Sequence, residues 1–189
     1  MNTIAINTVI LPGLIPLLLF LLFTYLHLQS RQPYFRAWQL AWAAYTLHFA
    51  LDVWAKSAGS NVLIELISSL LLVAMSLCIL VSTRLTRRLT TSERQEAYRP
   101  RWYELGVALA GIALAAWDLK GVASGTAVFP IAHLKLGMGI AAVLAYSSFH
   151  FYLAAQRRSS PAFYLLFVSM AFWVVLMFVG QFRPVLSEM

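Results

Sequence analysis

The sequence predicts an all-α fold, a polytopic bundle of transmembrane helices, and three observations predict it. Hydrophobic residues make up 61% of the 189 residues and charged residues only 11%, whereas soluble domains carry about 25% charged residues. The apolar residues fall into long stretches, and arginine gathers in alternate connections between them. A helix that crosses a bilayer core of about 30 Å needs roughly 20 apolar residues, because lipid cannot hydrogen-bond an open backbone. This composition therefore excludes a soluble globular domain.

Six stretches are long and apolar enough to be spans, and together they predict a single transmembrane domain over residues 1–189. A basic cytoplasmic connection, 84–101, separates the first three from the last three, and both an amphipathic surface helix and a flexible loop are open for it. The predicted spans are 8–28, 34–55, 62–83, 102–118, 129–155 and 162–182.

Individual features support these assignments in chain order. The first stretch contains the apolar run 14–23 and lacks a basic start, which favours a membrane span over a cleaved signal peptide. Cys78, in the third stretch, is the only cysteine and is interpreted as a small core residue. Pro130 lies near the start of the fifth, where its missing N–H is harmless. The sixth is rich in aromatic residues between Phe163 and Phe178.

The arginines predict the orientation, because Lys and Arg accumulate in short cytoplasmic loops. One side receives ten arginines: Arg31, Arg36, Arg84, Arg87, Arg88, Arg94, Arg99, Arg101, Arg157 and Arg158. The other side receives four basic residues: Lys56, Lys120, Lys135 and Arg183. Both termini are therefore expected outside the cytoplasm. The protein itself is expected in the inner membrane of a bacterium.

The net charge of +7 does not predict a nucleic-acid partner, because the arginines form short juxtamembrane clusters. Anionic lipid headgroups are the expected contacts, made by Arg84, Arg87, Arg88, Arg157 and Arg158. Aromatic belts are expected at both interfaces: Trp38, Trp102 and Tyr103 at the inner one, and Trp54, Trp117 and Phe129 at the outer one.

Polar residues in the outer half of the bundle form the candidate ligand site. Tyr45, His48, Asp52 and Lys56 recur at spacings of three and four and so share a helix face. Ionisable residues within a bilayer are functional candidates by default. The predicted ligand residues are His48, Asp52, Glu65, His133 and Lys135, of which the last two are preferred. The competing interpretation is that Asp52, Lys56, Asp118 and Lys120 are boundary residues whose charged ends reach water.

No catalytic residue is predicted, because the chain contains no phosphate-binding glycine loop, no metal-binding His-Glu-x-x-His and no nucleophile elbow. The sequence therefore does not predict an enzyme, a metal site or a required cofactor. Haem remains an open alternative through two histidine pairs, His48 with His133 or His27 with His150.

The segment Leu28–Trp42, with Arg36, Trp38, Ala41 and Trp42 in a basic, aromatic turn and helix start, resembles the multi-span N-terminal sensory modules of bacterial histidine kinases and diguanylate cyclases. This resemblance implies a role in signal transduction, as in two-component systems, and a kinase or cyclase domain further along a longer chain. Such modules commonly end in the cytoplasm, so a seventh span would be expected after Glu188.

Three functions are consistent with these observations. The leading hypothesis is a membrane sensor that responds to a small ligand or to the state of the membrane by changing its helix packing. The second is an accessory subunit of a larger membrane complex, and the third is a small transporter. The expected partners are the lipid bilayer, a small-molecule ligand, and a second copy or larger membrane assembly.

Overall fold

The computed structural model describes residues 3–58, 62–90, 101–123, 134–158 and 161–187, and these fold into six α-helices. The helices are α1 (Thr3–Ser30), α2 (Pro33–Ala58), α3 (Val62–Thr90), α4 (Trp102–Ala123), α5 (Leu134–Arg158) and α6 (Pro161–Ser187). The described part of the chain contains no strand. The predicted all-α bundle is therefore confirmed.

The main difference from the predicted spans is at the end of α3, which continues to Thr90 into the interval predicted to be a connection. Two threonines in this last part donate hydrogen bonds to carbonyls one turn earlier, Thr83 to Ile79 at 2.9 Å and Thr86 to Ser82 at 2.9 Å. Both threonines are buried. Polar residues whose hydroxyls bond within the helix do not interrupt it, so α3 continues beyond the predicted span.

The turn between α1 and α2 is set by three consecutive residues. Arg31 has a positive φ of 53°, and its N–H donates to the carbonyl of His27 at 2.8 Å, which is the left-handed arrangement that ends many helices. The carbonyl of Gln32 accepts from Phe35 at 3.2 Å. Pro33 then occupies the first position of α2, where the missing proline N–H costs no helical hydrogen bond.

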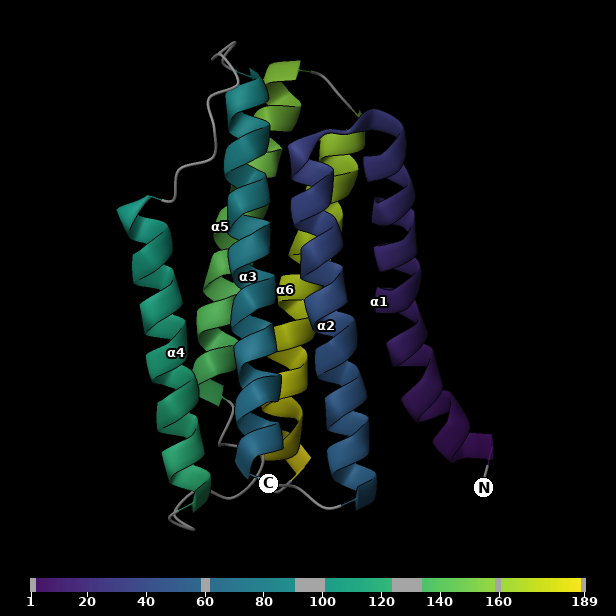
Figure 1. Cartoon of the computed structure of the whole chain (residues 1–189), viewed down its shortest axis with the longest axis vertical. Helices are drawn as coiled ribbons and strands as arrows, with labels where there is room; N and C mark the ends of the chain where they lie inside the picture. The colour runs from purple at the N-terminus through teal and green to yellow at the C-terminus, as the bar shows by residue number, and fades with distance from the viewer. Residues whose placement is uncertain (1–2, 59–61, 91–100, 124–133, 159–160, 188–189) are drawn as a thin grey trace.

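Helix α3 is the centre of the bundle. It packs along α2 on one side and along α4 and α5 on the other, whereas α1 packs only on α2 and α6 only on α5 among the described residues. Consecutive helices run in opposite directions, and the start of α1 and the end of α6 lie at the same end of the bundle (Figure 1). The molecule therefore contains two outer hairpins, α1/α2 and α5/α6, which are joined through α3.

Close approach of α3 and α4 depends on Gly111. A Cβ atom added to this residue would lie 2.7 Å from Cγ1 and 3.0 Å from Cγ2 of Val73 on α3. Gly106, also on α4, has no atom within 4 Å of the place where its Cβ atom would lie. Of these two glycines, only Gly111 therefore has to lack a side chain for the helices to pack.

The carboxylate of Asp118 joins α4 to the start of α5. Its Oδ2 accepts a hydrogen bond from the N–H of Leu136 at 3.2 Å, and the side chain is buried. The first N–H groups of a helix have no partner within that helix and favour a negative charge. Asp118 therefore caps α5, and the interpretation of this residue as a boundary residue reaching water was wrong.

Three helices have described segments that are long and apolar enough to cross a membrane. These segments are Val62–Thr86 in α3, Trp102–Lys120 in α4 and Leu136–Arg157 in α5. Helices α1 and α6 contain shorter apolar stretches, Leu14–Gln29 and Phe163–Val175. The outward surface is apolar to match, with large side chains such as Leu109 and Leu165 each 68% exposed.

Candidate ligand site

The predicted outer cluster is only partly described. His48 of α2 hydrogen-bonds α3, because its Nδ1 lies 2.7 Å from Oγ and 3.2 Å from the carbonyl oxygen of Ser68. Asp52 and Glu65 are half-buried. His133 lies outside the described residues, as does the side chain of Lys135. A ligand site formed by all five residues therefore stays a prediction.

The histidines proposed for haem on the inner side are on helices α1 and α5, and haem between them stays a prediction. His27 is on α1 and its Nδ1 contacts the carbonyl of Gln32 at 3.3 Å, whereas His150 is on α5 with its ring centroid 4.4 Å from that of Tyr146. Helices α1 and α5 do not pack on each other among the described residues. The other pair, His48 with His133, cannot be placed because it includes a residue outside them.

Metal ligands do not cluster in the part of the chain that the structure describes, where no group of three or more His, Cys, Asp or Glu side chains could hold an ion. Cys78 is a half-buried free thiol on α3.

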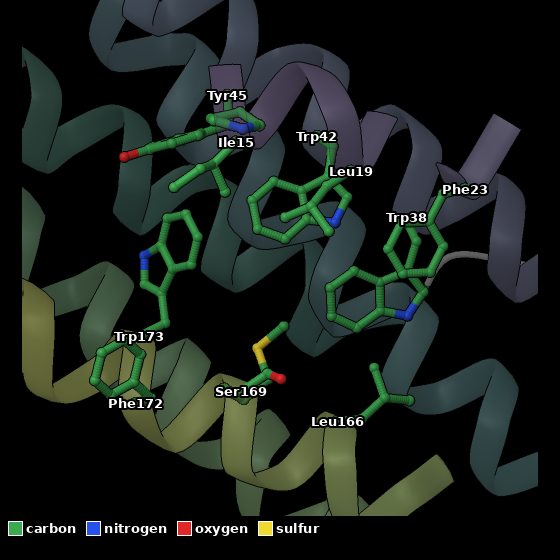
Figure 2. Close-up of a pocket in the computed structure, with 12 residues that line it drawn as sticks. Ile15, Leu19, Phe23, Trp38, Trp42, Tyr45, Leu166, Ser169, Phe172 and Trp173 are labelled. Carbon is green, nitrogen blue, oxygen red and sulfur yellow. The ribbon is translucent and has the colours of Figure 1, made fainter. Parts of the chain in front are cut away.

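A cavity of about 520 Å³ lies between the two outer hairpins (Figure 2). It falls within the range of roughly 300–1,000 Å³ that is common for small-molecule sites. We call it the hairpin cavity. Its walls come from three helices: Ile15, Pro16, Leu19 and Phe23 of α1; Trp38, Trp42 and Tyr45 of α2; Leu166, Ser169, Met170, Phe172 and Trp173 of α6.

The α2 and α6 walls of the hairpin cavity meet through side chains, among them aromatic rings. No described Cα atom of α2 lies within 8 Å of one in α6, yet the Trp173 ring centroid is 5.0 Å from that of Trp42 and 5.1 Å from that of Tyr45. A further contact joins Trp38 to Phe151 of α5, at 6.1 Å. The two hairpins therefore meet across the cavity through a few large side chains instead of close backbone packing.

Trp38 and Trp42 are core residues. Trp38 is 2% exposed and Trp42 7%, and the Trp38 ring stacks on Phe23 of α1 with centroids 5.3 Å apart and 13° between the planes. The prediction that Trp38 belongs to an interfacial belt was wrong, because this side chain faces the bundle. Trp102, Trp54 and Trp117 are 83%, 60% and 63% exposed, as an interfacial role requires.

Sequence reasoning missed the hairpin cavity although a signal was present. Trp38, Trp42 and Tyr45 are spaced by four and three residues, which places the three rings on one face of α2. The shared face of Tyr45 with His48 and Asp52 was recognised, but its extension toward the start of the helix was not. In a membrane helix both faces are apolar, so the direction of an aromatic stripe cannot be read from hydropathy alone.

One polar atom in the wall lacks a partner. The indole Nε1 of Trp42 is buried and has no hydrogen-bond acceptor among the described residues. A buried donor without an acceptor costs about 1–3 kcal/mol. Trp42 therefore contributes to this site through its ring, because its N–H is enclosed by protein and is not exposed to the cavity.

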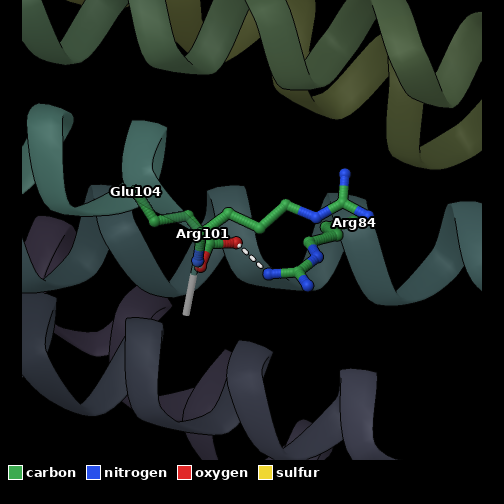
Figure 3. Close-up of polar contacts among 3 residues, drawn as sticks. All are labelled: Arg84, Arg101 and Glu104. Carbon is green, nitrogen blue, oxygen red and sulfur yellow. Dashed lines mark hydrogen bonds and ion pairs between the residues drawn. The ribbon is translucent and has the colours of Figure 1, made fainter. Parts of the chain in front are cut away.

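The arginine-rich end contains a buried ion pair (Figure 3). Nη1 of Arg84 lies 2.9 Å from Oε1 of Glu104, and the two side chains are 8% and 4% exposed. The other carboxylate oxygen, Oε2, accepts from the backbone N–H of Arg101 at 3.0 Å, which caps the first turn of α4. Arg84 thus joins α3 to α4, and its predicted contact with anionic lipid was wrong because the side chain faces protein.

The remaining arginines divide into exposed and undescribed side chains. Arg157 of α5 is exposed, and Arg31 and Arg36 at the α1/α2 turn are exposed at the same end. The side chains of Arg87, Arg88 and Arg158 lie outside the described residues. Contact with anionic lipid at Arg157 and these three positions stays a prediction.

Comparison with known proteins gives no match to this chain, whether with family models, curated proteins or solved structures.

Proposed function

We propose that this chain is a membrane-embedded sensory module that binds an apolar small molecule in the hairpin cavity and responds by changing the packing of its two outer hairpins. The proposal has three parts: all six helices cross a bacterial inner membrane, the cavity takes a ligand from the bilayer, and the hairpins adopt a second arrangement when it is filled.

Six crossings are supported by the way the less apolar helices are placed. Helix α2 has 26 residues, a length of about 39 Å at 1.5 Å per residue, and it lies between α1 and α3. Its polar side chains bond within the bundle: Thr46 donates to the carbonyl of Trp42 at 2.7 Å, and His48 bonds Ser68. Helices α1 and α6 run beside α2 and α5 in antiparallel order (Figure 1).

The observation that carries the sensory proposal is the construction of the hairpin cavity. Helix α6 is packed along α5 but has no close backbone approach to α2, and it meets α2 through side chains such as Trp173. A molecule that entered beside Trp173 would have to displace it or separate the hairpins. A ligand shifts a conformational equilibrium only by its difference in affinity for the two states. Because the two hairpins are loosely joined, the cavity between them would differ in shape in a second arrangement, and the ligand would bind one arrangement more tightly.

The response is expected at the arginine-rich end. The turn between α1 and α2 lies there, and so do the end of α5 and the beginning of α6 (Figure 1). Separation of the hairpins changes the distance between these two regions, which a cytoplasmic partner or domain would detect.

Spin-label distance measurements test the proposal. Gln29 and Tyr164 are exposed and lie on different hairpins, so a cysteine at each, with Cys78→Ala as background, reports their separation. The doubly labelled protein is placed in synthetic phosphatidylcholine bilayers and in bilayers of total bacterial lipid extract. We expect the mean distance to differ by about 2 Å or more, the size of helix shifts in known switches.

Two further samples make the test decisive. A label pair within one hairpin, at Gln29 and Leu40, is expected to show no change between the two bilayers. Ser169→Trp places a large side chain at the cavity wall and is expected to abolish the lipid-dependent difference. A distance between hairpins that stays the same in both bilayers, or a lipid effect that persists in Ser169→Trp, contradicts the proposal.

A further inference from the structure

The hairpin cavity has a polarity that restricts its ligand. None of its lining residues is charged. Apart from the enclosed N–H of Trp42, the polar groups among them are the hydroxyls of Tyr45 and Ser169 and the indole N–H groups of Trp38 and Trp173. Every one of these groups can donate a hydrogen bond, and the indoles cannot accept one. The cavity therefore matches an uncharged molecule that carries acceptor oxygens.

The shape of the walls restricts the ligand further. Trp42, Tyr45 and Trp173 form a three-ring cluster in which Tyr45 stands at 85° to Trp42 and 78° to Trp173. Phe23 and Trp38 present a second, nearly parallel stack. Aromatic walls favour flat conjugated rings, which gain from stacked and edge-to-face contacts in addition to the area that they bury.

Access to the cavity is lateral. Ile15 of α1 and Phe172 of α6 line it and are 51% and 61% exposed, and Ser169 is exposed as well. These residues lie at the outside of the bundle, on helices whose neighbouring outward side chains are also apolar. A ligand can therefore place its ring between the hairpins and leave a long apolar chain among the lipids.

We propose that the hairpin cavity binds a membrane lipid of the quinone class, an uncharged conjugated ring with carbonyl oxygens on an apolar tail. The ring packs against Trp42 and Trp173, and a carbonyl oxygen accepts from the donors of the wall. Since the ligand would be the signal, this inference rests on the proposed function, but it adds a chemical identity that can fail separately. It is a proposal of binding alone and includes no electron transfer.

The test uses the full chain in phosphatidylcholine nanodiscs with decylubiquinone as the probe. Binding is followed as a saturable rise in the thermal unfolding temperature and as quenching of tryptophan fluorescence. Decanol, which has the chain without the ring, is the matched probe. We expect decylubiquinone to stabilise the protein and decanol at the same concentration to have no comparable effect.

Two variants locate the binding site. Tyr45→Phe keeps the ring but removes a hydroxyl of a lining residue, so it is expected to fold normally and to weaken decylubiquinone binding about tenfold, the loss of one hydrogen bond of ordinary strength. Trp42→Phe leaves a smaller ring for stacking and is expected to weaken binding as well. Trp117→Phe is the control, because Trp117 is exposed on α4 away from the cavity.

The outcomes separate the two proposals. If decanol stabilises the protein as well as decylubiquinone does, or if Trp42→Phe and Tyr45→Phe bind the quinone like Trp117→Phe, the quinone inference is overturned. The sensory proposal survives that result if the spin-label distance still differs between lipid mixtures. If the distance never changes but the quinone binds with the expected variant pattern, the cavity is a quinone site without a sensory role.

Discussion

Three buried charged side chains connect neighbouring helices of this bundle. Arg84 and Glu104 are 8% and 4% exposed, and Asp118 is 4% exposed. Burial of each of these charges would destabilise the folded protein if the charge had no partner. Because each is paired with a group on another helix, these three residues specify which helices are neighbours.

The pair of Arg84 and Glu104 gives a prediction at this scale. Glu104→Gln keeps the capping function, since Gln also serves at that helix position. It leaves the buried charge of Arg84 without the Glu104 carboxylate. We expect it to lower the free energy of unfolding by about 3 kcal/mol, measured by titrating the protein in mixed micelles with sodium dodecyl sulfate.

Removal of both charges provides the control for this prediction. The double variant Arg84→Met/Glu104→Met is expected to recover much of the loss, because replacing a buried pair with apolar groups is often nearly neutral. Arg157→Gln, at an exposed position, is expected to change stability by less than about 0.5 kcal/mol. A Glu104→Gln variant as stable as Arg157→Gln would show that water reaches the pair.

The role of single residues was the hardest part to predict from the sequence. Arg84 and Glu104 are 20 positions apart, and nothing in their local pattern indicates that they meet. Trp38 is a tryptophan near a predicted membrane boundary, as belt residues are, but its side chain points inward. Depth along a membrane helix can be read from hydropathy, whereas the direction of a side chain around the helix depends on neighbours that sequence position does not identify.

At the scale of the helices, α4 is attached to α3 by the Arg84–Glu104 ion pair and by a tight contact, and to α5 by a cap. The tight contact is at Gly111 beside Val73. The cap is Asp118 on Leu136. Much of the remaining surface of α4 is exposed and apolar, including Leu105 and Ile112. Small changes at Gly111 should therefore have large effects on how α4 packs.

The two glycines of α4 provide a matched pair of variants. Gly111→Ala places a Cβ atom against the stiff side chain of Val73, and we expect it to destabilise the protein by about 1–3 kcal/mol, as overpacking commonly does. Gly106→Ala meets nothing within 4 Å and is expected to be neutral or stabilising by up to about 1 kcal/mol through helix propensity.

Unfolding in mixed micelles measures both glycine variants. Val73→Ala in the Gly111→Ala background should restore part of the lost stability, because it removes the methyl groups that the new Cβ would meet. Equal effects of alanine at positions 106 and 111 would show that α3 and α4 do not approach closely at Gly111.

The existence and type of the helices were predictable from the sequence, and their lengths less so. Long apolar runs leave helix as the main option in lipid, so the all-α fold follows from composition. Helix α3 continues beyond the predicted span, and there Thr83 and Thr86 satisfy their hydroxyls on the helix itself. The start of the predicted fifth span, residues 129–133, lies outside the described residues.

At the scale of the whole molecule, six antiparallel helices place the start of α1 and the end of α6 at one end of the bundle (Figure 1). The ends of α3 and α5 and the turn between α1 and α2 lie at the opposite end (Figure 1), and these segments contain Arg84, Arg157 and Arg31. With arginine on the cytoplasmic side, both chain ends should face outward from the cytoplasm.

Reporter fusions test this topology. Alkaline phosphatase, which is active only outside the cytoplasm, is expected to be active when fused after Met189 and inactive when inserted after Gln32. A fluorescent protein that matures only in the cytoplasm is expected to give the reverse pattern. Activity of the phosphatase at the Gln32 turn, or opposite locations for the two chain ends, would contradict six crossings with cytoplasmic arginines.

The cap that Asp118 provides for α5 has a consequence for biogenesis. The N–H of Leu136 receives its acceptor from α4, so α5 on its own would enter lipid with that group unsatisfied, and α4 on its own would carry a bare carboxylate. Each helix thus supplies what the other lacks at the moment of insertion. The pair is therefore expected to leave the insertion machinery together, with α4 retained there until α5 has been synthesised.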